Sequence, residues 1–180
     1  MIRFFIGMLI SCFLFLPVGC GYTTASLLPA ELDSIYVEDF KNDINPAGEI
    51  SDKRATYTYR TGMENDITRA IIDKFIYDKT LDIENKSNAA LFMKGALKDF
   101  RQSTVSYNTD SQAEEYRMEI FVDVEVYNQL TGELMWEEKG FLGEITYAIT
   151  GPNSITESTA VTNTIADLAQ RILERTVEVW

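Results

Sequence analysis

The sequence contains few residues whose types and spacing could support catalysis. It has no His among its 180 residues, which removes the usual general base near neutral pH and the commonest zinc ligand. Two pairs of adjacent acids, at 114–115 and 137–138, stand in predicted strands, where neighbouring side chains point to opposite faces, so neither pair can form a two-carboxylate site by itself. No Gly-rich phosphate loop and no nucleophile with an identifiable base is present. We therefore expect no enzymatic activity, no metal site and no cofactor.

Cys20 has the clearest chemical context of any side chain in the sequence. It follows an apolar run over residues 4–16 and the small residues Val18 and Gly19. The run is short for a membrane span and is typical of a secretory signal. A run that ends in small residues and a Cys resembles a bacterial lipoprotein signal, in which that Cys becomes the lipidated first residue. We therefore predict a signal peptide over residues 1–19 and a lipid anchor, with palmitate, on Cys20.

The residues before Cys20 leave alternatives to a lipoprotein signal open, and the cleavage site decides which cysteines remain. Pro17 stands where the lipoprotein motif usually has Leu, so an ordinary secretory signal or a membrane anchor stays open as an alternative. If Cys20 begins the mature chain, Cys12 is removed with the signal, and neither a free thiol nor a disulfide remains.

The mature chain would then keep 15 basic and 28 acidic residues, a formal net charge of −13. Such acidity argues against a nucleic-acid partner, because Lys and Arg supply most of the affinity for phosphates.

A long β-hairpin from Glu115 to Leu142 is the main structural element that we predict. Over residues 116–126 apolar side chains occupy every second position and charged side chains most positions between them, which predicts a half-buried strand. Residues 129–132 supply a turn, and the return strand places Leu134 and Trp136 on one side. The alternation reappears beyond residue 143, so we expect the last strand to continue past a kink at that glycine. Because a hairpin alone is marginal in water, its apolar face needs a cover.

Two amphipathic helices, one on either side of the hairpin in sequence, are the candidates for this cover. The first begins at a predicted capping box of Thr61 with Glu64, and the second at one of Ser154 with Glu157. Their apolar stripes have helical spacing, which predicts that they pack in the core. The stripes consist of Met63, Ile67, Ala70, Ile71 and Phe75 in the first helix, and of Val161, Ile165, Leu168, Ala169, Ile172 and Leu173 in the second.

The remaining segments complete one domain. Residues 34–40 and 89–100 are predicted strands, a turn at 108–111 joins the second of them to the hairpin, and residues 41–61 form a long loop. The predicted order is strand, helix, strand, strand, strand, helix: an α+β domain in which two helices pack on one face of a mainly antiparallel four-stranded sheet. One parallel pairing is allowed in the first strand–helix–strand unit. We divide the chain into a signal peptide (1–19), a lipidated N-terminus with its tether (20–32) and this single domain (33–180).

Several segments together resemble a known family. They are Cys20-Gly21-Tyr22, Leu28-Pro29, IYVEDFKN at 35–42, GMENDITRAIIDKFI at 62–76 and EEYRMEIFVDVEVYNQLTGELMWEEKGF at 114–141. This combination is similar to the LptE family, the lipopolysaccharide-assembly lipoproteins of Gram-negative outer membranes. The resemblance implies a lipid-anchored, periplasm-facing protein of the outer membrane that is not an enzyme. It also implies a role as plug and assembly partner of the β-barrel LptD in lipopolysaccharide transport to the cell surface.

The resemblance suggests sites that the residues support to different degrees. It implies lipopolysaccharide binding through basic residues near strand ends and loops. Residues 103–113, which include the predicted turn, contain neither Lys nor Arg. The nearest candidates are Lys94, Lys98 and Arg101, and solubilising charges on an exposed face are the alternative. Phe121 and Tyr127, on the charged face of the hairpin, are predicted to contact the polar lumen of a barrel.

Two alternatives remain open from the sequence. The charged face could be the solvated side of an antiparallel sheet. The whole protein could instead be a periplasm-facing scaffold or binding lipoprotein of another envelope complex. The protein that co-purifies with it, a large β-barrel or some other partner, distinguishes these functions.

Overall fold

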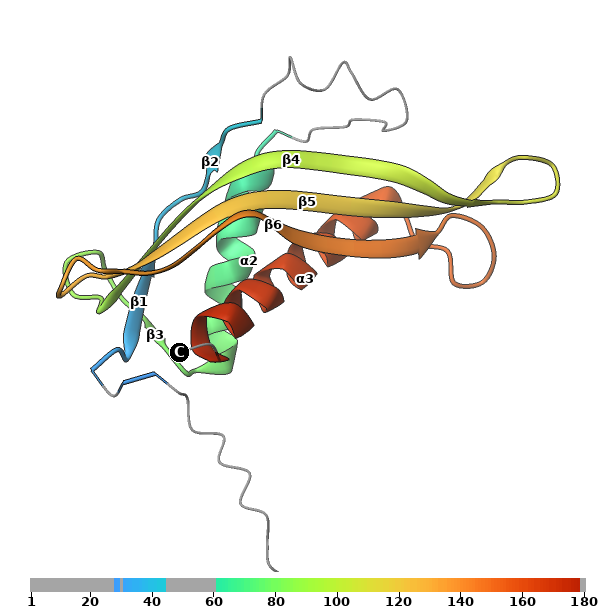
Figure 1. Ribbon diagram of the computed structural model, residues 1–180. Helices are drawn as coiled ribbons and strands as arrows, with labels where there is room; N and C mark the ends of the chain where they lie inside the picture. The colour runs from blue at the N-terminus through green and yellow to red at the C-terminus, as the bar shows by residue number, and fades with distance from the viewer. Residues whose placement is uncertain (1–27, 30, 45–60, 179–180) are drawn as a thin grey trace, which may run out of the picture.

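The structure, a computed structural model, describes residues 28, 29, 31–44 and 61–178 (Figure 1). The predicted signal peptide, Cys20, most of the predicted tether and residues 45–60 of the predicted loop lie outside these described residues. Within the described part of the chain, neither helix is long and apolar enough to cross a membrane.

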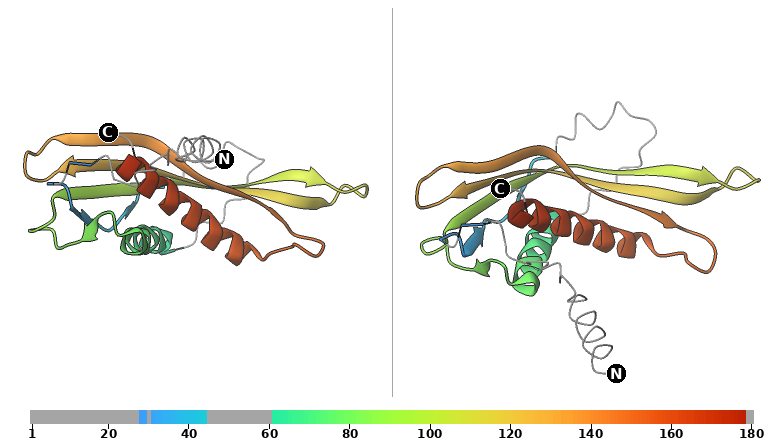
Figure 2. Two further views of the ribbon diagram at one scale, coloured as in Figure 1. Left: turned by 90° about the horizontal axis from the view of Figure 1, so that it is seen from below. Right: turned by 60° about the horizontal axis from the view of Figure 1, so that its bottom comes forward.

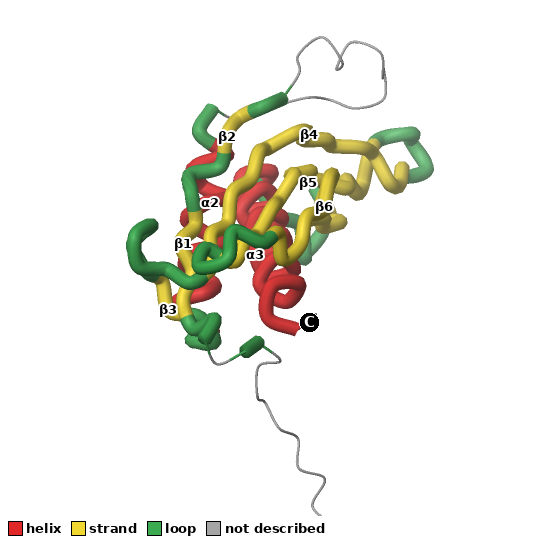
Figure 3. The backbone as a smooth tube through the Cα atoms, turned by 60° about the vertical axis from the view of Figure 1, so that its left-hand side comes forward, coloured by secondary structure: helices red, strands yellow, loops and turns green. Residues whose placement is uncertain are grey.

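The described residues form two helices and one six-stranded sheet. The strands are β1 (Ser34–Val37), β2 (Lys41–Asn42), β3 (Asp82–Ile83), β4 (Leu91–Tyr107), β5 (Ala113–Asn128) and β6 (Leu134–Ala148), and the helices are α2 (Met63–Asp78) and α3 (Glu157–Glu178). The strand order is β3-β1-β4-β5-β6, and β2 also pairs with β4. Neighbours among β4, β5 and β6 are antiparallel, whereas β1, β2 and β3 make parallel pairings along one side of the sheet (Figure 3).

The fold class is confirmed as α+β with two helices, but the predicted four-stranded, mainly antiparallel sheet is wrong. The described sheet is mixed and has six strands. The parallel pairing allowed by the sequence is present between β1 and β4, where Ile35 lies opposite Leu91. The two strands that were missed, β2 and β3, have two residues each. A two-residue strand is too short to show alternation, so its geometry depends on the strand beside it.

Phe40 explains why the first strand is shorter than predicted. The strand ends at Val37 instead of continuing to residue 40. The Phe40 side chain is buried, and its backbone N–H donates to the Thr68 hydroxyl of α2 at 3.0 Å. Gly95 of β4 makes room for the ring, because a Cβ atom at that position would lie 2.2 Å from a ring carbon of Phe40. The chain therefore leaves the sheet after β1 so that Phe40 can pack between β4 and α2.

The strand predicted over 89–100 is longer than expected and continues as β4 to Tyr107. The turn predicted at 108–111 is confirmed, and the Asn108 side chain accepts hydrogen bonds at 2.9 Å from the backbone N–H groups of Asp110 and Gln112. Residues 103–107 are mostly polar, so they carry no apolar signal, but they form a ladder with the first residues of β5. Pairing with β5 therefore extends the strand beyond the range that its own side chains predict.

β6 runs past Gly143 to Ala148, but the predicted kink lies elsewhere. The β5–β6 pairing is interrupted at Gly140, which has a φ of 67° and donates its N–H to the Asp123 carboxylate at 2.8 Å. Gly143 lies against α3, where a Cβ atom would stand 2.5 Å from Leu168 Cβ and 2.9 Å from Leu168 Cα. The absence of a side chain at Gly143 therefore lets α3 approach the sheet closely.

A second irregularity moves Leu134 off the core face. The sequence places Leu134 and Trp136 on the same side, and Trp136 is buried, but Leu134 is 42% exposed. The register with β5 shifts between Val126 and Tyr127, so Leu134 lies opposite Tyr127 while Trp136 lies opposite Val126. A register shift of this kind changes which face a side chain joins.

The core lies between the two helices and one face of the sheet (Figure 2). On β5 the apolar residues at alternate positions are 0–1% exposed: Met118, Ile120, Val122, Val124 and Val126. The predicted stripes of both helices are buried or partly buried in the same cluster, together with Trp136. The predicted packing of hairpin against helices is therefore confirmed.

Both helices begin later than their predicted capping boxes. The residue before α2 is Gly62, with a φ of 94° and no side-chain cap, so the capping box of Thr61 with Glu64 is wrong. α3 is capped by Thr156, whose hydroxyl accepts a hydrogen bond at 3.2 Å from the Thr159 N–H, so the box that begins at Ser154 is also wrong. Where a helix start is rich in hydroxyl residues and acids, several positions match the capping-box sequence pattern. The local backbone conformation then decides which residue caps the helix.

Candidate partner-binding face

The sheet has a second face, turned away from the helices, that carries the predicted partner-binding residues. Phe121 and Tyr127 alternate with the buried residues of β5 and are partly exposed. Both helices lie on the other side of the sheet, so neither covers them (Figure 2). We call this surface the open face; it consists of Tyr36 of β1, Phe92, Lys94, Lys98 and Arg101 of β4, and Arg117, Glu119, Phe121, Asp123, Glu125 and Tyr127 of β5.

Three aromatic rings gather at one end of the open face. Tyr36 and Phe92 stack with ring centroids 6.0 Å apart and an interplanar angle of 8°, and the Tyr127 ring lies 6.5 Å from that of Phe92. The Lys86 ammonium lies 4.7 Å from the Phe92 ring centroid and 2.9 Å from the Glu38 carboxylate. A cation over an aromatic face is attracted by the negative side of the ring quadrupole. The rings therefore form a platform with an ion pair at its edge.

Lys94 and Tyr127 interact with the same carboxylate. The Lys94 ammonium lies 2.9 Å from Glu125 and 5.1 Å from the Tyr127 ring centroid, and the Tyr127 hydroxyl donates to Glu125. The hydrogen bonds from Tyr127 and then from Lys94 lower the pKa of Glu125. The hydrogen bond to Glu125 raises the pKa of Lys94, and donation to the same carboxylate raises the pKa of Tyr127. The three groups therefore hold one another in their usual charge states at neutral pH.

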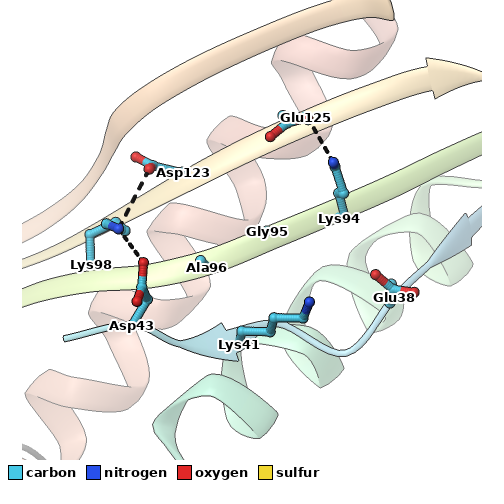
Figure 4. Close-up of a pocket in the computed structure, with 9 residues that line it drawn as sticks. All are labelled: Glu38, Lys41, Asp43, Lys94, Gly95, Ala96, Lys98, Asp123 and Glu125. Atoms are coloured by element: carbon cyan, nitrogen blue, oxygen red, sulfur yellow. Dashed lines mark hydrogen bonds and ion pairs between the residues drawn. The ribbon is translucent and has the colours of Figure 1, made fainter.

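Lys98 lies beside an open pocket of about 220 Å³ on the same face (Figure 4). It pairs with Asp43, and its ammonium is 4.0 Å from the Asp123 carboxylate; the hydrogen bond to Asp43 raises the pKa of Lys98. The charged side chains that line the pocket are three lysines and four acids, so their formal charges sum to −1: Lys41, Lys94, Lys98, Glu38, Asp43, Asp123 and Glu125. This balance does not favour a phosphate group.

Arg101 repeats the arrangement of Lys94 further along β4. Its guanidinium lies 2.6 Å from the Asp99 carboxylate and 4.9 Å from the Phe121 ring centroid. A planar guanidinium can stack on a ring and bind a carboxylate at the same time. Phe121 is therefore partly covered by a paired cation.

The structure thus brings two of the three predicted lipopolysaccharide-binding residues into contact with the predicted partner-binding residues, whereas Lys98 pairs with Asp43 and Asp123 instead. Lys94 lies over Tyr127, and Arg101 lies over Phe121. Each of the three basic candidates also has a carboxylate within 4.0 Å, so a phosphate would have to displace it. The sequence places Phe121 and Tyr127 on one face by their spacing, but it does not show these contacts, because they depend on the register between strands. The binding roles of these residues stay predictions.

Sequence and structure comparisons identify related proteins. The family model LptE, described as lipopolysaccharide-assembly, matches residues 32–176. Among solved structures, the hypothetical protein CT253 from Chlamydia trachomatis is 8% identical, with 80% of this chain and 95% of that chain covered and a TM-score of 0.50. The rare lipoprotein B from Shewanella oneidensis is 15% identical, with 79% and 92% covered and a TM-score of 0.47. Comparison with curated proteins gives no match.

These findings have different weights. The CT253 likeness, at 8% identity, indicates a similar fold and nothing about function. The family match includes every described strand, all of α2 and α3 up to residue 176. It therefore covers the elements that build both the core and the open face. On this match, the chain belongs to the LptE family of lipopolysaccharide-assembly proteins.

Proposed function

We propose that this protein is a non-enzymatic, periplasm-facing outer-membrane lipoprotein that acts as the plug and assembly partner of an LptD-type β-barrel. In this role it takes part in lipopolysaccharide transport to the cell surface. The observation that carries the proposal is the family match over residues 32–176.

The chemistry of the open face supports docking inside a barrel. Its partly exposed aromatic side chains, Phe121 and Tyr127, are of the type enriched at protein interfaces. Most of its charges are already paired on the protein, as Lys94 is with Glu125 and Arg101 with Asp99, so a partner need not supply every counter-charge. A surface of paired charges and amphipathic rings suits a polar, wet barrel lumen better than lipid.

The anchor in this proposal is an acylated Cys20 at the start of the mature chain, after removal of residues 1–19. Two or more acyl chains would hold the protein stably on the membrane, whereas one chain would hold it weakly. The intact mass of protein extracted from membranes should show the loss of residues 1–19 and the added mass of acyl chains. A mature chain that begins at any other residue would contradict this.

Direct contact with lipopolysaccharide is proposed at Lys94, Lys98 and Arg101, through exchange of their carboxylate partners for phosphate. Arg101 is the best placed of the three, because a guanidinium binds phosphate in a bidentate manner and because it lies outside the pocket with the net negative charge. Replacing all three by Ala should weaken binding of purified lipopolysaccharide in a direct titration. Unchanged binding would remove these residues from the proposal and leave the barrel role intact.

Depletion of the protein in cells tests the main function. We expect both the correctly assembled barrel and surface lipopolysaccharide to decrease together. If both stay normal, the barrel role is wrong, and the protein is better described as a scaffold lipoprotein of another envelope complex.

A pair of matched double variants tests the docking surface. Phe121→Glu with Tyr127→Glu should weaken co-purification of the barrel, because it puts two new carboxylates on the open face. Ile76→Glu with Tyr77→Glu makes the same change at exposed positions on α2, where these side chains are 56% and 87% exposed, and should leave co-purification unchanged. Thermal unfolding of both proteins checks that the domain stays folded. Equal loss of barrel in the two variants would contradict the assignment of the open face.

A further inference from the structure

The two edges of the sheet differ in how their backbone groups are protected. An exposed strand edge presents unpaired N–H and C=O groups to other chains, and most proteins block it with charges, bulges or a covering element. β6 forms one edge. The other edge is formed partly by β3, β1 and β2 and, beyond them, by the second half of β4.

The β6 edge is blocked in several ways. The Glu144 N–H donates to the Asp167 carboxylate of α3 at 3.0 Å. Residues 137–139, two acids and a lysine, are exposed, and the irregularity at Gly140 interrupts the strand next to them. Each of these features hinders the addition of another strand.

β4 is covered along only part of its outer edge by the described residues. The Glu38 N–H donates to the Met93 carbonyl and the Asp43 N–H to the Leu97 carbonyl, both at 2.9 Å. Met93 and Leu97 have buried side chains, so the core-facing residues of β4 direct their backbone groups toward this edge. The described pairings of β1 and β2 stop at Leu97, whereas β4 continues to Tyr107.

The same alternation identifies the backbone N–H and C=O groups beyond Leu97 that point away from β5, which we call the outward groups. Phe100, Gln102 and Thr104 lie opposite the core-side residues of β5, so their backbone groups point away from β5. The Phe100 N–H is occupied by the neighbouring Asp99 carboxylate at 2.9 Å. The N–H groups of Gln102 and Thr104 and the carbonyls of all three residues face an edge on which no other described strand lies.

Apart from the Asp99 carboxylate on the Phe100 N–H, the side chains of this stretch do not block the edge. Residues 99–107 include no Lys and no Pro, and the guanidinium of Arg101 lies over Phe121 on the open face. Val105 and Tyr107 are 44% and 62% exposed, which leaves apolar surface beside the outward backbone groups. The β4–β5 register shifts between Thr104 and Ser106 and again between Ser106 and Tyr107, so the regular run of outward groups extends from Phe100 to Thr104. Outward groups on alternate residues are the pattern that an extended polypeptide pairs with.

We propose that the outer edge of β4 between Phe100 and Thr104 accepts an extended segment of the barrel partner as an added strand. The inference rests on the proposed function for the identity of the partner. The outward groups match an extended backbone in spacing, which a lipid or a sugar does not provide. A second copy of this chain is disfavoured, because each copy carries a formal charge of −12, or −13 after the proposed loss of residues 1–19.

Residue-resolved amide hydrogen exchange tests this pairing directly. The full chain purified alone and the complex purified with its barrel are compared under the same conditions. The Gln102 and Thr104 amides should exchange at least about tenfold more slowly in the complex, because a new strand would hydrogen-bond them. The amides of Arg101 and Ser103 face β5 in the ladder and serve as internal controls, with little change expected.

A proline variant provides an independent measurement. Thr104→Pro removes one outward N–H without removing a hydrogen bond to β5, and proline is tolerated on edge strands in this orientation. It should reduce the yield of barrel in co-purification several-fold, whereas Thr104→Val, which keeps the N–H, should not. If Thr104→Pro unfolds the domain in a thermal scan, the exchange measurement on the unmodified chain decides.

The possible outcomes separate this inference from the proposed function. If the barrel complex forms but Gln102 and Thr104 exchange as in the free protein, the added strand is wrong and the proposed function stands. If these amides are protected in the free protein at every concentration, the chain fills its own edge, and the inference fails. Protection that rises with concentration would assign the edge to a second copy and also overturn it. If no barrel co-purifies, the proposed function and this inference fail together.

Discussion

The two faces of β5 differ in what their side chains contribute. On the helix side, alternate residues from Met118 to Val126 are closed to solvent and pack in one core with α2 and α3. On the open face, the residues between them stay partly exposed and interact mainly with neighbouring strands through ion pairs and ring contacts. Successive residues of a single strand therefore belong to two different environments.

The comparison indicates where the folding stability comes from. Burial of apolar surface contributes roughly 25 cal/mol per Å², whereas an exposed ion pair contributes about 0–1 kcal/mol. We infer that the helix side holds the domain together and that the open face can change without unfolding it. A surface with this property can be specialised for a partner.

The largest effect is expected from truncating α3 at the core. Leu168→Ala removes a fully buried side chain and should lower the free energy of unfolding by about 2–5 kcal/mol. Urea unfolding followed by circular dichroism measures the change. Asn163→Ala, at an exposed position of the same helix, is the control and should cause no comparable loss. Equal losses at the two positions would mean that the helix face is assigned wrongly.

A smaller effect is expected where the helix and the sheet touch. Ala usually suits a strand better than Gly, but Gly143→Ala would place a Cβ 2.9 Å from the Leu168 backbone. Overpacking of this kind costs about 1–3 kcal/mol, so the variant should be less stable than the parent. The informative result is the sign of the change in unfolding free energy, measured by the same unfolding experiment. A gain in stability would mean that α3 does not approach the sheet at this residue.

The comparison can be tested on two adjacent residues. Val124→Ala removes two buried methyl groups and should cost about 2 kcal/mol, at roughly 0.8 kcal/mol per buried carbon group with a small cavity added. Glu125→Ala removes a partly exposed ion pair and should cost less than about 1 kcal/mol. Chemical unfolding of the two variants side by side gives the ratio of their losses in unfolding free energy. A larger cost at Glu125 than at Val124 would reverse our view of the two faces.

The smallest effect concerns the pH dependence of the open face. Tyr127 and Lys94 lower the pKa of Glu125 in the folded protein, so its contribution to stability is present above the ordinary carboxyl pKa and disappears as the pH falls through the lowered value. The difference in unfolding free energy between the parent and Glu125→Gln should therefore be largest near neutral pH and shrink as the pH falls below about 4.

The control for this pH effect removes the two partners of Glu125. When Lys94→Met and Tyr127→Phe are combined, Glu125→Gln should produce almost no pH-dependent difference in the same unfolding measurement. A difference that persists in this background would show that Glu125 is stabilised by other groups.

Local patterns were sufficient to predict the main elements. The alternation in β5 and the helical spacing of Ile67 and Leu168 each repeat several times within one segment, so they identify a strand and two helices with a buried side. The spacing of Phe121 and Tyr127 likewise places both on the open face. These features need no knowledge of distant residues, because burial selects apolar side chains at the period of the element itself.

By itself, therefore, the sequence determined the long hairpin, the two amphipathic helices and the side of β5 that each residue joins. Only the tertiary structure decided the two-residue strands β2 and β3, the exposure of Leu134 and the close contact of Gly143 with α3. It also decided the ion pairs, since Lys98 and Asp43 are 55 residues apart and Lys86 and Glu38 are 48 apart. The physical reason is that such contacts depend on strand register and on the approach of distant segments, which leave no periodic trace in the chain.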